Sequence, residues 1–504
     1  MFEKHLCVGY SRRTALQAIC GLSGSLGLHP WARAQTAQST ASVWRAASRV
    51  GYGPSVDLLH QIQAAASPRD WALAQVDGAH QASAIPPRIP TEMMDFNAPL
   101  PQLFDGAQKE RQARKQVRSG EAEKPEIDAA RFDFAGERDP LHFSRLVVQQ
   151  GVAWRLLSAS RPSQENPLLA RMTEFWFNHL NVYAGKGAVR PFVGHYAINV
   201  ARAHALGRFE DLLLASARHP AMLFYLDQVR SVADGSRDEQ GGTRGLNENY
   251  ARELMELHTL GVDGGYSQND VHALARVLTG WTVGPNNPSG FRFVARLHDI
   301  RAKQVMGSNF PGSASLAGEE EGVNAVRMLA RHPSTARRVC LRLAQFFVSD
   351  QPSESLVARL SRTFLSTQGD LREVMTALIA SDDFWLNENR LFKTPMDYAC
   401  SVLCGIQTPL DKRNLVLATG FLANAGQPVH GWQTPDGYKT DAATWLVPQA
   451  LTRRADFALA VSRQSTELEF LHPFLSADTR AALASERPAL RAGLALASPD
   501  FMYK

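Results

Sequence analysis

Residues 245–281, GLNENYARELMELHTLGVDGGYSQNDVHALARVLTGW, constrain the fold more than any other stretch of the chain. Apolar or small residues recur there at spacings of three or four, at Tyr250, Leu254, Leu257 and Gly261. This spacing predicts a helix with one face in a core. The glycines of residues 263–265 predict a turn, and Ser267 with Asp270 three residues later predicts a capping box. The stretch therefore predicts two helices joined by a glycine turn.

Two carboxylates, Glu253 and Glu256, lie one turn apart on the neighbouring stripe of the first predicted helix. Carboxylates at this spacing repel each other unless a cation or a proton lies between them, so they suit a metal ion or an acid–base pair. Helical bundles build metal sites from such inward carboxylates. The alternative is that Arg252 and arginines of other helices neutralise both acids in ion pairs. We predict both glutamates as catalytic and metal-binding residues, with a divalent metal ion as the expected cofactor.

Two further motifs supply the remaining candidate residues. His179 follows Asn178 at the end of an aromatic helix, where it could be a general base or a metal ligand. A hydrogen bond to a backbone carbonyl explains this histidine equally well. His298 and Asp299 resemble the His-Asp pair of one class of metal phosphohydrolases, but the further ligands of that class are missing. The alternative is that Asp299 caps the segment before Lys303. We predict His179, His298 and Asp299 as further metal ligands, with His179 also catalytic.

Residues 1–34 have the features of an export signal. The segment 11–17, SRRTALQ, is a twin-arginine pattern, although Ala15 stands where a bulky phenylalanine is more common. A weakly apolar run and an A-x-A cleavage site at residues 32–34 follow. The alternative is an ordinary secretory peptide that contains an arginine pair. The sequence thus predicts a periplasmic or secreted protein exported by the twin-arginine route. Because that route carries folded proteins, it favours a bound cofactor.

The composition excludes several kinds of protein. Residues 1–34 carry four basic residues and one acid, so the formal charge of +5 falls to +2 without them. This near-neutral balance gives no electrostatic case for nucleic-acid binding. No apolar run reaches the roughly 18–20 residues that span a bilayer. The sequence also has no His-Glu-x-x-His motif, phosphate-binding loop or dinucleotide-binding fingerprint.

Helical periodicity recurs along most of the chain and predicts a mainly α protein, a multi-helix globular body with few short strands. Only Phe291–Ala295 and Gln427–Trp432 are expected to be extended. After the signal peptide, residues 35–80 are predicted to form a small helical unit. Residues 81–138 are a proline-rich and then charged linker or insert, and residues 139–504 form the main helical domain.

The residues from Asn247 to Trp281 closely resemble the signature of the bacterial domain of unknown function 1800 family. Further pieces similar to that family occur in the expected order along the chain, namely FWFNHLNV at 175–182, His298-Asp299 with a downstream lysine and glycine, and GQPVHGW through TRRADFA at 426–458. The resemblance spans nearly the whole mature chain. It implies family membership but no reaction, because none is assigned to the family. Family members are often encoded beside an exported sulfatase-like family, which implies a sulfatase-like partner.

Two functions are consistent with these observations. The first is a periplasmic metal-dependent enzyme with a carboxylate and histidine site between helices. The second is a non-catalytic scaffold or binding module of the cell envelope, in which the same residues lock helices together through ion pairs.

Overall fold

The computed structural model describes residues 40–120, 132–136, 139–236, 245–312, 317–406, 411–465 and 468–504. The predicted signal peptide and most of the charged segment between residues 121 and 138 lie outside the described residues. In the described part of the chain, no helix combines the length and apolar character needed to cross a bilayer.

Backbone contacts divide the chain into two compact units. Unit 1 contains the chain up to Trp71, Arg390–Gly426 and Asp441–Lys504. Unit 2 contains Ala72–Asn389 and Gln427–Thr440. The bounds drawn from sequence at residues 80 and 138 are a different division, because they rest on composition and not on contacts between distant segments.

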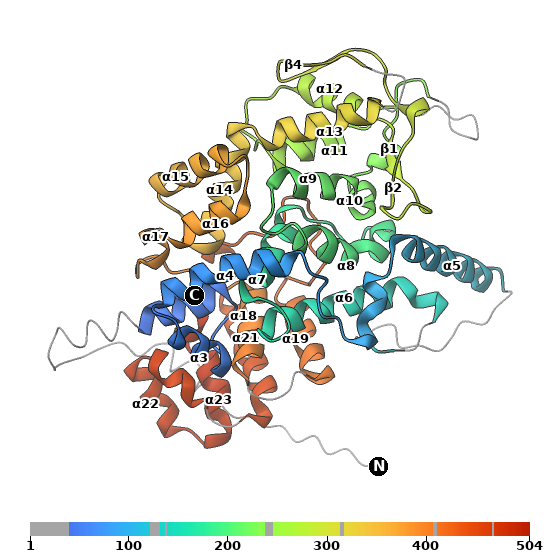
Figure 1. The fold of residues 1–504 in the computed structure, drawn as a ribbon. Helices are drawn as coiled ribbons and strands as arrows, with labels where there is room; N and C mark the ends of the chain where they lie inside the picture. The colour runs from blue at the N-terminus through green and yellow to red at the C-terminus, as the bar shows by residue number, and fades with distance from the viewer. Residues whose placement is uncertain are drawn as a thin grey trace. The chain divides into compact units, whose positions relative to one another are not determined.

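Unit 1 is helical (Figure 1). Its elements are η1 (Ala46–Val50), α3 (Val56–Ala64), α18 (Pro395–Gly405), α19 (Lys412–Asn424), α20 (Ala442–Trp445), α21 (Pro448–Val461), η9 (Ser462–Gln464), η10 (Glu469–Phe474), α22 (Ala477–Ser485), α23 (Pro488–Ala497) and η11 (Pro499–Met502). Helix α21 packs against α18, α19 and α23. The fully buried Lys393 donates a hydrogen bond from Nζ to Ser401 Oγ at 2.8 Å, and its ammonium lies over the Phe501 ring. Burial lowers the pKa of Lys393 well below its usual value, and the charges of Arg454 and Lys504 add to this effect while Asp397 opposes it.

Unit 2 is also mainly helical, which confirms the predicted fold class (Figure 1). Its helical elements are α4 (Pro68–Ser83), which contains the boundary between the units, η2 (Thr91–Asn97), α5 (Leu100–Ser119), η3 (Pro140–His142), α6 (Phe143–Ser160), α7 (Pro167–His179), η4 (Gly187–Phe192), α8 (Val193–Tyr196), η5 (Ala197–Arg202), α9 (Phe209–Arg218), α10 (Pro220–Tyr225), η6 (Gln228–Arg230), α11 (Asn249–Glu253), η7 (Leu254–His258), α12 (Gln268–Leu278), η8 (Ala295–Leu297), α13 (Ala317–Ala330), α14 (Pro333–Phe347), α15 (Glu354–Ser366), α16 (Leu371–Ile379) and α17 (Asp382–Trp385). Helix α5 lies in the predicted linker or insert. It buries apolar side chains that the charged sequence obscures, namely Leu100, Leu103, Phe104 and Ala107.

The described strands form two small antiparallel sheets. Strand β1 (Trp281–Val283) pairs with β2 (Phe291–Phe293), and β3 (Lys303–Val305) pairs with β4 (Ser308–Phe310). Strand β2 confirms residues 291–293 of the extended segment predicted at residues 291–295, whereas Ala295 begins the short helix η8. The prediction of an extended segment at Gln427–Trp432 is wrong. It contains a turn at residues 429–430 and no strand, and His430 adopts a left-handed backbone with φ 59°.

The predicted capping box is present at the start of α12. Ser267 accepts a hydrogen bond from the Asp270 backbone N–H, and the Asp270 side chain accepts one from the Ser267 backbone N–H. The apolar side chains of Val271, Leu274, Ala275 and Leu278 on α12 are buried. The preceding turn needs glycine, since Gly261 has φ 89° and Gly265 has φ 84°.

The first helix of the 245–281 stretch differs from the prediction of one regular α-helix. Helix α11 passes directly into the π-helix η7. At its end, the Met255 carbonyl accepts a hydrogen bond from the Gly261 N–H at 3.2 Å, and the Leu254 carbonyl accepts one from Thr259 Oγ1 at 2.6 Å. A π-turn contains more residues than an α-turn, so the 3.6-residue spacing fails beyond Glu253. Such π-turns are concentrated at functional sites.

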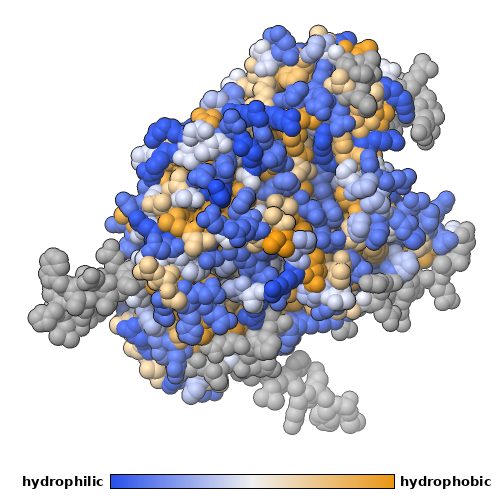
Figure 2. Space-filling view, viewed as in Figure 1, coloured by the Kyte–Doolittle hydropathy of each residue, from blue (hydrophilic) through white to orange (hydrophobic). Residues whose placement is uncertain are grey.

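Hydrophilic residues cover most of the face drawn in Figure 2, with hydrophobic residues in smaller groups between them. Exposed large apolar side chains in the described residues are mostly dispersed along the chain, for example Ile85, Val262 and Ile300. Dispersed apolar residues are normal on a protein surface. The polar clusters of unit 2 are therefore the more informative features.

Candidate functional site

The structure places four of the five predicted site residues in two polar clusters of unit 2. We call the first the η7–α14 cluster, which consists of Glu253, Glu256, His258, Arg338 and Arg342. We call the second the His298 network, which consists of Arg276, His298, Asp299, Lys303 and Glu321. No hydrogen bond or ion pair between described residues joins the two clusters. The structure therefore separates the five predicted residues, with His179 contacting only the first cluster.

Glu253 and Glu256 are half-buried and have no hydrogen bond or ion pair with another described residue. Arg252, which the structural alternative assigned to them, instead pairs with Glu248 at 3.2 Å. Burial raises the pKa of Glu253, and the charges of Glu256 and Asp436 raise it further against the opposing effect of Arg252. Glu253 is thus a carboxyl group with an increased tendency to hold a proton.

Two arginines of α14, Arg338 and Arg342, lie one turn apart and bring positive charge to this cluster. Arg338 donates from Nε to the Leu257 carbonyl at 3.0 Å, which fixes its guanidinium beside η7. Burial and mutual repulsion lower the pKa of Arg338, while Tyr266 and Glu256 oppose this shift. Burial also lowers the pKa of Arg342, against the effects of Asp436 and Tyr438. Neither arginine forms an ion pair with a carboxylate of the described residues.

His179 is buried at the end of α7, and its Nε2 lies 3.1 Å from the His258 carbonyl. Because a carbonyl can only accept, Nε2 of His179 carries the proton of the ring. Burial, with the charges of Arg342 and Arg338, lowers the pKa of His179 well below its usual value. His179 is therefore a neutral donor that holds the backbone of η7, as the backbone-carbonyl alternative predicts.

His258 is also buried, and its Nε2 has no hydrogen-bond partner among the described residues. Burial and the charge of Arg338 lower the pKa of His258 to about 3. This second neutral imidazole was not singled out as a ligand by the sequence, because it resembles an ordinary helical histidine. Its missing partner becomes evident only in the fold.

Residues 427–440, which we call the clamp segment, are held against the end of α7. Asn178 donates from Nδ2 to the Tyr438 carbonyl at 3.0 Å and accepts from the Tyr438 N–H at 2.7 Å. Tyr438 also donates from its hydroxyl to Glu174 Oε1 at 2.6 Å. The Ala184 N–H donates to the His430 carbonyl at 3.0 Å. These contacts bring Asp436 and Tyr438 into the electrostatic range of Arg342.

His430 is a further residue of interest in the clamp segment. It is buried, its φ is positive, and neither ring nitrogen has a partner among the described residues. Its ring packs edge-on against Phe177 at 4.9 Å. His430 lies in the GQPVHGW motif, but the sequence does not identify it as a site residue. Neither its burial nor its backbone strain can be predicted from periodicity.

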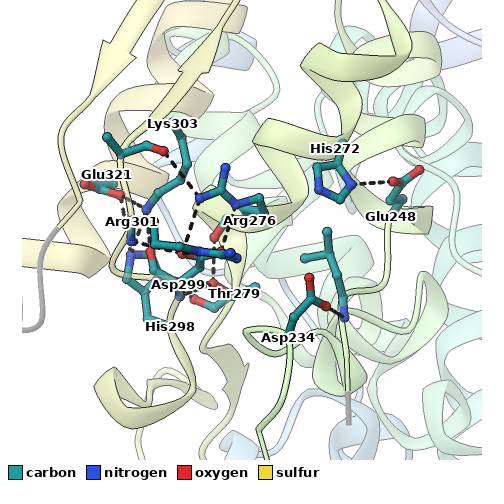
Figure 3. A network of polar contacts seen from close by, with 12 residues as sticks. Asp234, Glu248, His272, Arg276, Thr279, His298, Asp299, Arg301, Lys303 and Glu321 are labelled. Carbon is teal, nitrogen blue, oxygen red and sulfur yellow. Dashed lines mark hydrogen bonds and ion pairs between the residues drawn. The ribbon is translucent and has the colours of Figure 1, made fainter.

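The His298 network is closely paired (Figure 3). Asp299 accepts hydrogen bonds from Arg276 Nε at 2.8 Å and from Arg301 Nη2 at 2.5 Å. It also accepts the Arg301 backbone N–H at 3.0 Å, so it caps a local turn. Burial raises the pKa of Asp299, but the bonds from Arg301 and Arg276 outweigh it and hold the pKa well below its usual value. These donors occupy the lone pairs that a metal ion would need.

His298 and Lys303 complete this network (Figure 3). Lys303 Nζ is buried and donates to Glu321 Oε2 and to the Asp299 carbonyl, each at 2.6 Å. His298 Nδ1 lies 2.9 Å from the Thr279 carbonyl, so it carries the ring proton. His298 Nε2 faces Lys303 Nζ at 3.4 Å. Burial lowers the pKa of His298, and the charge of Lys303 adds to this effect.

No group of three or more histidine, cysteine, aspartate or glutamate side chains in the described ranges is arranged to hold a metal ion. Glu253 and Glu256 remain the residues that would offer unoccupied carboxylate oxygens. What the η7–α14 cluster offers chemically is a carboxyl group with a raised pKa, beside two guanidinium groups and the neutral imidazole of His258, with the imidazole of His179 in contact.

The sequence profile of the family described as "Protein of unknown function (DUF1800)" matches residues 45–503. Comparisons with curated proteins and with solved structures give no match. The matched range includes both polar clusters and the clamp segment, and it confirms the resemblance seen in the sequence. The chain belongs to the DUF1800 family.

Proposed function

We propose that this protein is an exported enzyme of the cell envelope in which Glu253 acts as a general acid and base. The observation that carries the proposal is that Glu253 is half-buried beside Glu256 yet has no ion-pair partner among the described residues. Carboxyl groups that only stabilise a fold are normally paired or solvated, whereas catalytic acids are kept poised to exchange a proton. The reaction class is proton transfer to and from a polar substrate.

The other residues of the cluster support this role without exchanging protons themselves. The negative charge of Glu256 contributes to the raised pKa of Glu253. His179 is a positioning residue, because its ring donates to the backbone of η7 and so holds the segment that follows Glu253. Arg338 holds the same segment through the Leu257 carbonyl. Preorganised groups of this kind favour catalysis because they need not rearrange during the reaction.

Glu253→Gln is expected to make the protein more stable at pH 8 by roughly a few tenths of a kcal/mol after solvent screening. The pKa of Glu253 is raised in the fold, so its ionised form opposes folding above the ordinary glutamate pKa of about 4.3. The gain should disappear as the pH falls to about 4, where the folded wild-type protein binds the proton. Urea unfolding at pH 8, 6 and 4 measures this difference.

Glu248→Gln is the matched control, because Glu248 accepts hydrogen bonds from His272 and Gln268 and pairs with Arg252. The bond from His272 is the main cause of its lowered pKa, so Glu248 contributes stability above the ordinary glutamate pKa. Its replacement should therefore destabilise the protein at pH 8. If Glu253→Gln were destabilising to a similar degree, Glu253 would be an ordinary structural residue and the proposal would fail.

The sequence predicts a divalent metal ion at this site, and the proposal includes a form in which such an ion is bound. Glu253 and Glu256 would hold it, because Asp299, His298 and His179 are engaged in other contacts. Elemental analysis of the exported protein, purified without chelators or a histidine tag, tests this form. Stoichiometric metal that is lost in Glu253→Gln would support it, and metal-free, well-folded protein would favour acid–base chemistry by the side chains alone.

Export by the twin-arginine route is part of the proposal and rests on residues 1–34, which lie outside the described residues. Replacing both Arg12 and Arg13 by lysine should retain the protein in the cytoplasm, as measured by cell fractionation.

A non-catalytic envelope module with an exported sulfatase-like partner is the second candidate. It is favoured by the paired state of the His298 network, which resembles a structural lock. Co-purification of such a partner with both wild-type and Glu253→Gln protein would support it.

A further inference from the structure

We propose that Arg338 and Arg342 bind an oxyanion group of the ligand: a carboxylate, a sulfate or a phosphate. The inference rests on the proposed function in one respect, since it names the ligand class of the same η7–α14 cluster. It does not require that Glu253 transfers a proton.

The contacts of three arginines on one helix carry this inference. Arg337 of α14 is exposed and forms a two-pronged ion pair with both carboxylate oxygens of Glu354. Arg338 has one hydrogen-bond partner among the described residues, the neutral Leu257 carbonyl, which accepts from its Nε. Arg342 has no hydrogen bond or ion pair with another described residue. The two less exposed arginines are thus the ones without a counter-ion among the residues that the structure describes.

This arrangement is energetically unfavourable without a further anion. Arginine side chains are seldom withdrawn from water unless they are paired, and a guanidinium cannot discard its charge at physiological pH. The charge of Arg342 also repels that of Arg338 and contributes to the lowered pKa of Arg338. An oxyanion would satisfy both groups, because guanidinium donors match the geometry of carboxylate, sulfate and phosphate oxygens.

The acids nearby do not fill this role. Glu256 and Asp436 stabilise the charged forms of Arg338 and Arg342, respectively, through space. Neither acid is close enough to form an ion pair with these arginines. Asp436 is exposed and accepts a hydrogen bond from Thr434 Oγ1 at 2.5 Å. The acids therefore favour the positive charge of the site while leaving guanidinium donors for a ligand.

Thermal unfolding of the full chain with added inorganic phosphate, sulfate or acetate tests the site, with sodium chloride at matched ionic strength as the reference. Phosphate or sulfate also stabilises proteins generally, so the measure is the difference between variants. At least one oxyanion should raise the Tm of the wild-type protein above the reference. Arg342→Gln should weaken its binding by about tenfold or more, because a charge-assisted contact is lost.

Arg337→Gln is the matched control on the same helix, and it should retain the oxyanion-dependent shift in Tm. Glu253→Gln should also retain or strengthen the shift, since it removes a nearby negative charge and no cation. This result separates the inference from the proposed function, which can fail while the anion site remains. Equal shifts in wild-type and Arg342→Gln protein, or no shift beyond the chloride reference, would overturn the inference. If Arg342→Gln were to misfold, Arg342→Lys should bind the oxyanion less tightly than wild type while keeping the charge.

Discussion

Glu321→Gln is expected to lower the free energy of unfolding by about 3–5 kcal/mol, because it removes the charge that compensates the buried Lys303. The two oxygens of Glu321 both accept hydrogen bonds, one from Lys303 Nζ and the other from the Gly312 N–H, each at 2.6 Å. A glutamine has one oxygen and one NH₂ group, so its NH₂ group would face either Lys303 Nζ or the Gly312 N–H, and both of these are donors. Urea unfolding at neutral pH measures the loss.

Glu354→Gln is the control for this prediction, because its ion pair with Arg337 is exposed and should contribute little. The reason for the loss can be tested by adding Lys303→Met to Glu321→Gln. Removing the uncompensated charge should then restore part of the stability, since an apolar side chain of similar length can replace a buried ion pair at small cost. A further large loss in the double variant would show that the ion pair is not the dominant interaction.

The local parts of this fold could be predicted from the sequence because their signals are local. The capping box of Ser267 and Asp270 depends on residues three positions apart. The positive φ of Gly261 follows from its place after an apolar helical stripe. The π-turn at η7 could not be predicted in this way, because its sequence satisfies the spacing of a regular α-helix equally well.

The candidate site could be predicted only in part, for the same physical reason. Glu253 and Glu256 are neighbours on one segment, so their spacing was enough to identify them as a pair. Arg338 and Arg342 lie on a helix about eighty residues further along the chain, and no periodicity predicts that Arg338 bonds to the Leu257 carbonyl next to this pair. The pairing of Asp299 with Arg276 is likewise a tertiary contact. A His-Asp sequence alone cannot distinguish this ion-pair network from a metal site.

Stability and function place opposite demands on the two clusters. In the His298 network, the carboxylate of Asp299 and the ammonium of Lys303 have partners, so the charges support the fold. In the η7–α14 cluster, Glu253 and Arg342 have no ion-pair partner in the described part of the chain and should oppose folding. Proteins retain such unfavourable groups mainly where activity or binding requires them. The difference between the clusters is therefore the structural reason for placing the site at η7 and not at His298.

Gly437→Ala is expected to lower the free energy of unfolding by about 3 kcal/mol or more, because two unfavourable effects add at this position. Gly437 has φ 70°, and an alanine in this left-handed conformation costs about 1–2 kcal/mol. Its Cβ would also lie 2.2 Å from the Asn178 backbone oxygen and 2.4 Å from Oδ1 of the same residue. Asn178 cannot move away easily, because it holds Tyr438 through two hydrogen bonds. Urea unfolding measures the loss.

Gly307→Ala separates the two effects, since Gly307 has φ 79° but its Cβ would meet no atom within 4 Å. Gly307→Ala should lower the free energy of unfolding only by the backbone contribution of about 1–2 kcal/mol. Gly437→Ala should also loosen the clamp segment, so hydrogen exchange should accelerate at the Ala184 amide, which is bonded to His430. Equal losses of stability in both variants, with unchanged exchange at Ala184, would contradict this role of Gly437. They would show that its close contact with Asn178 does not hold the clamp segment against α7.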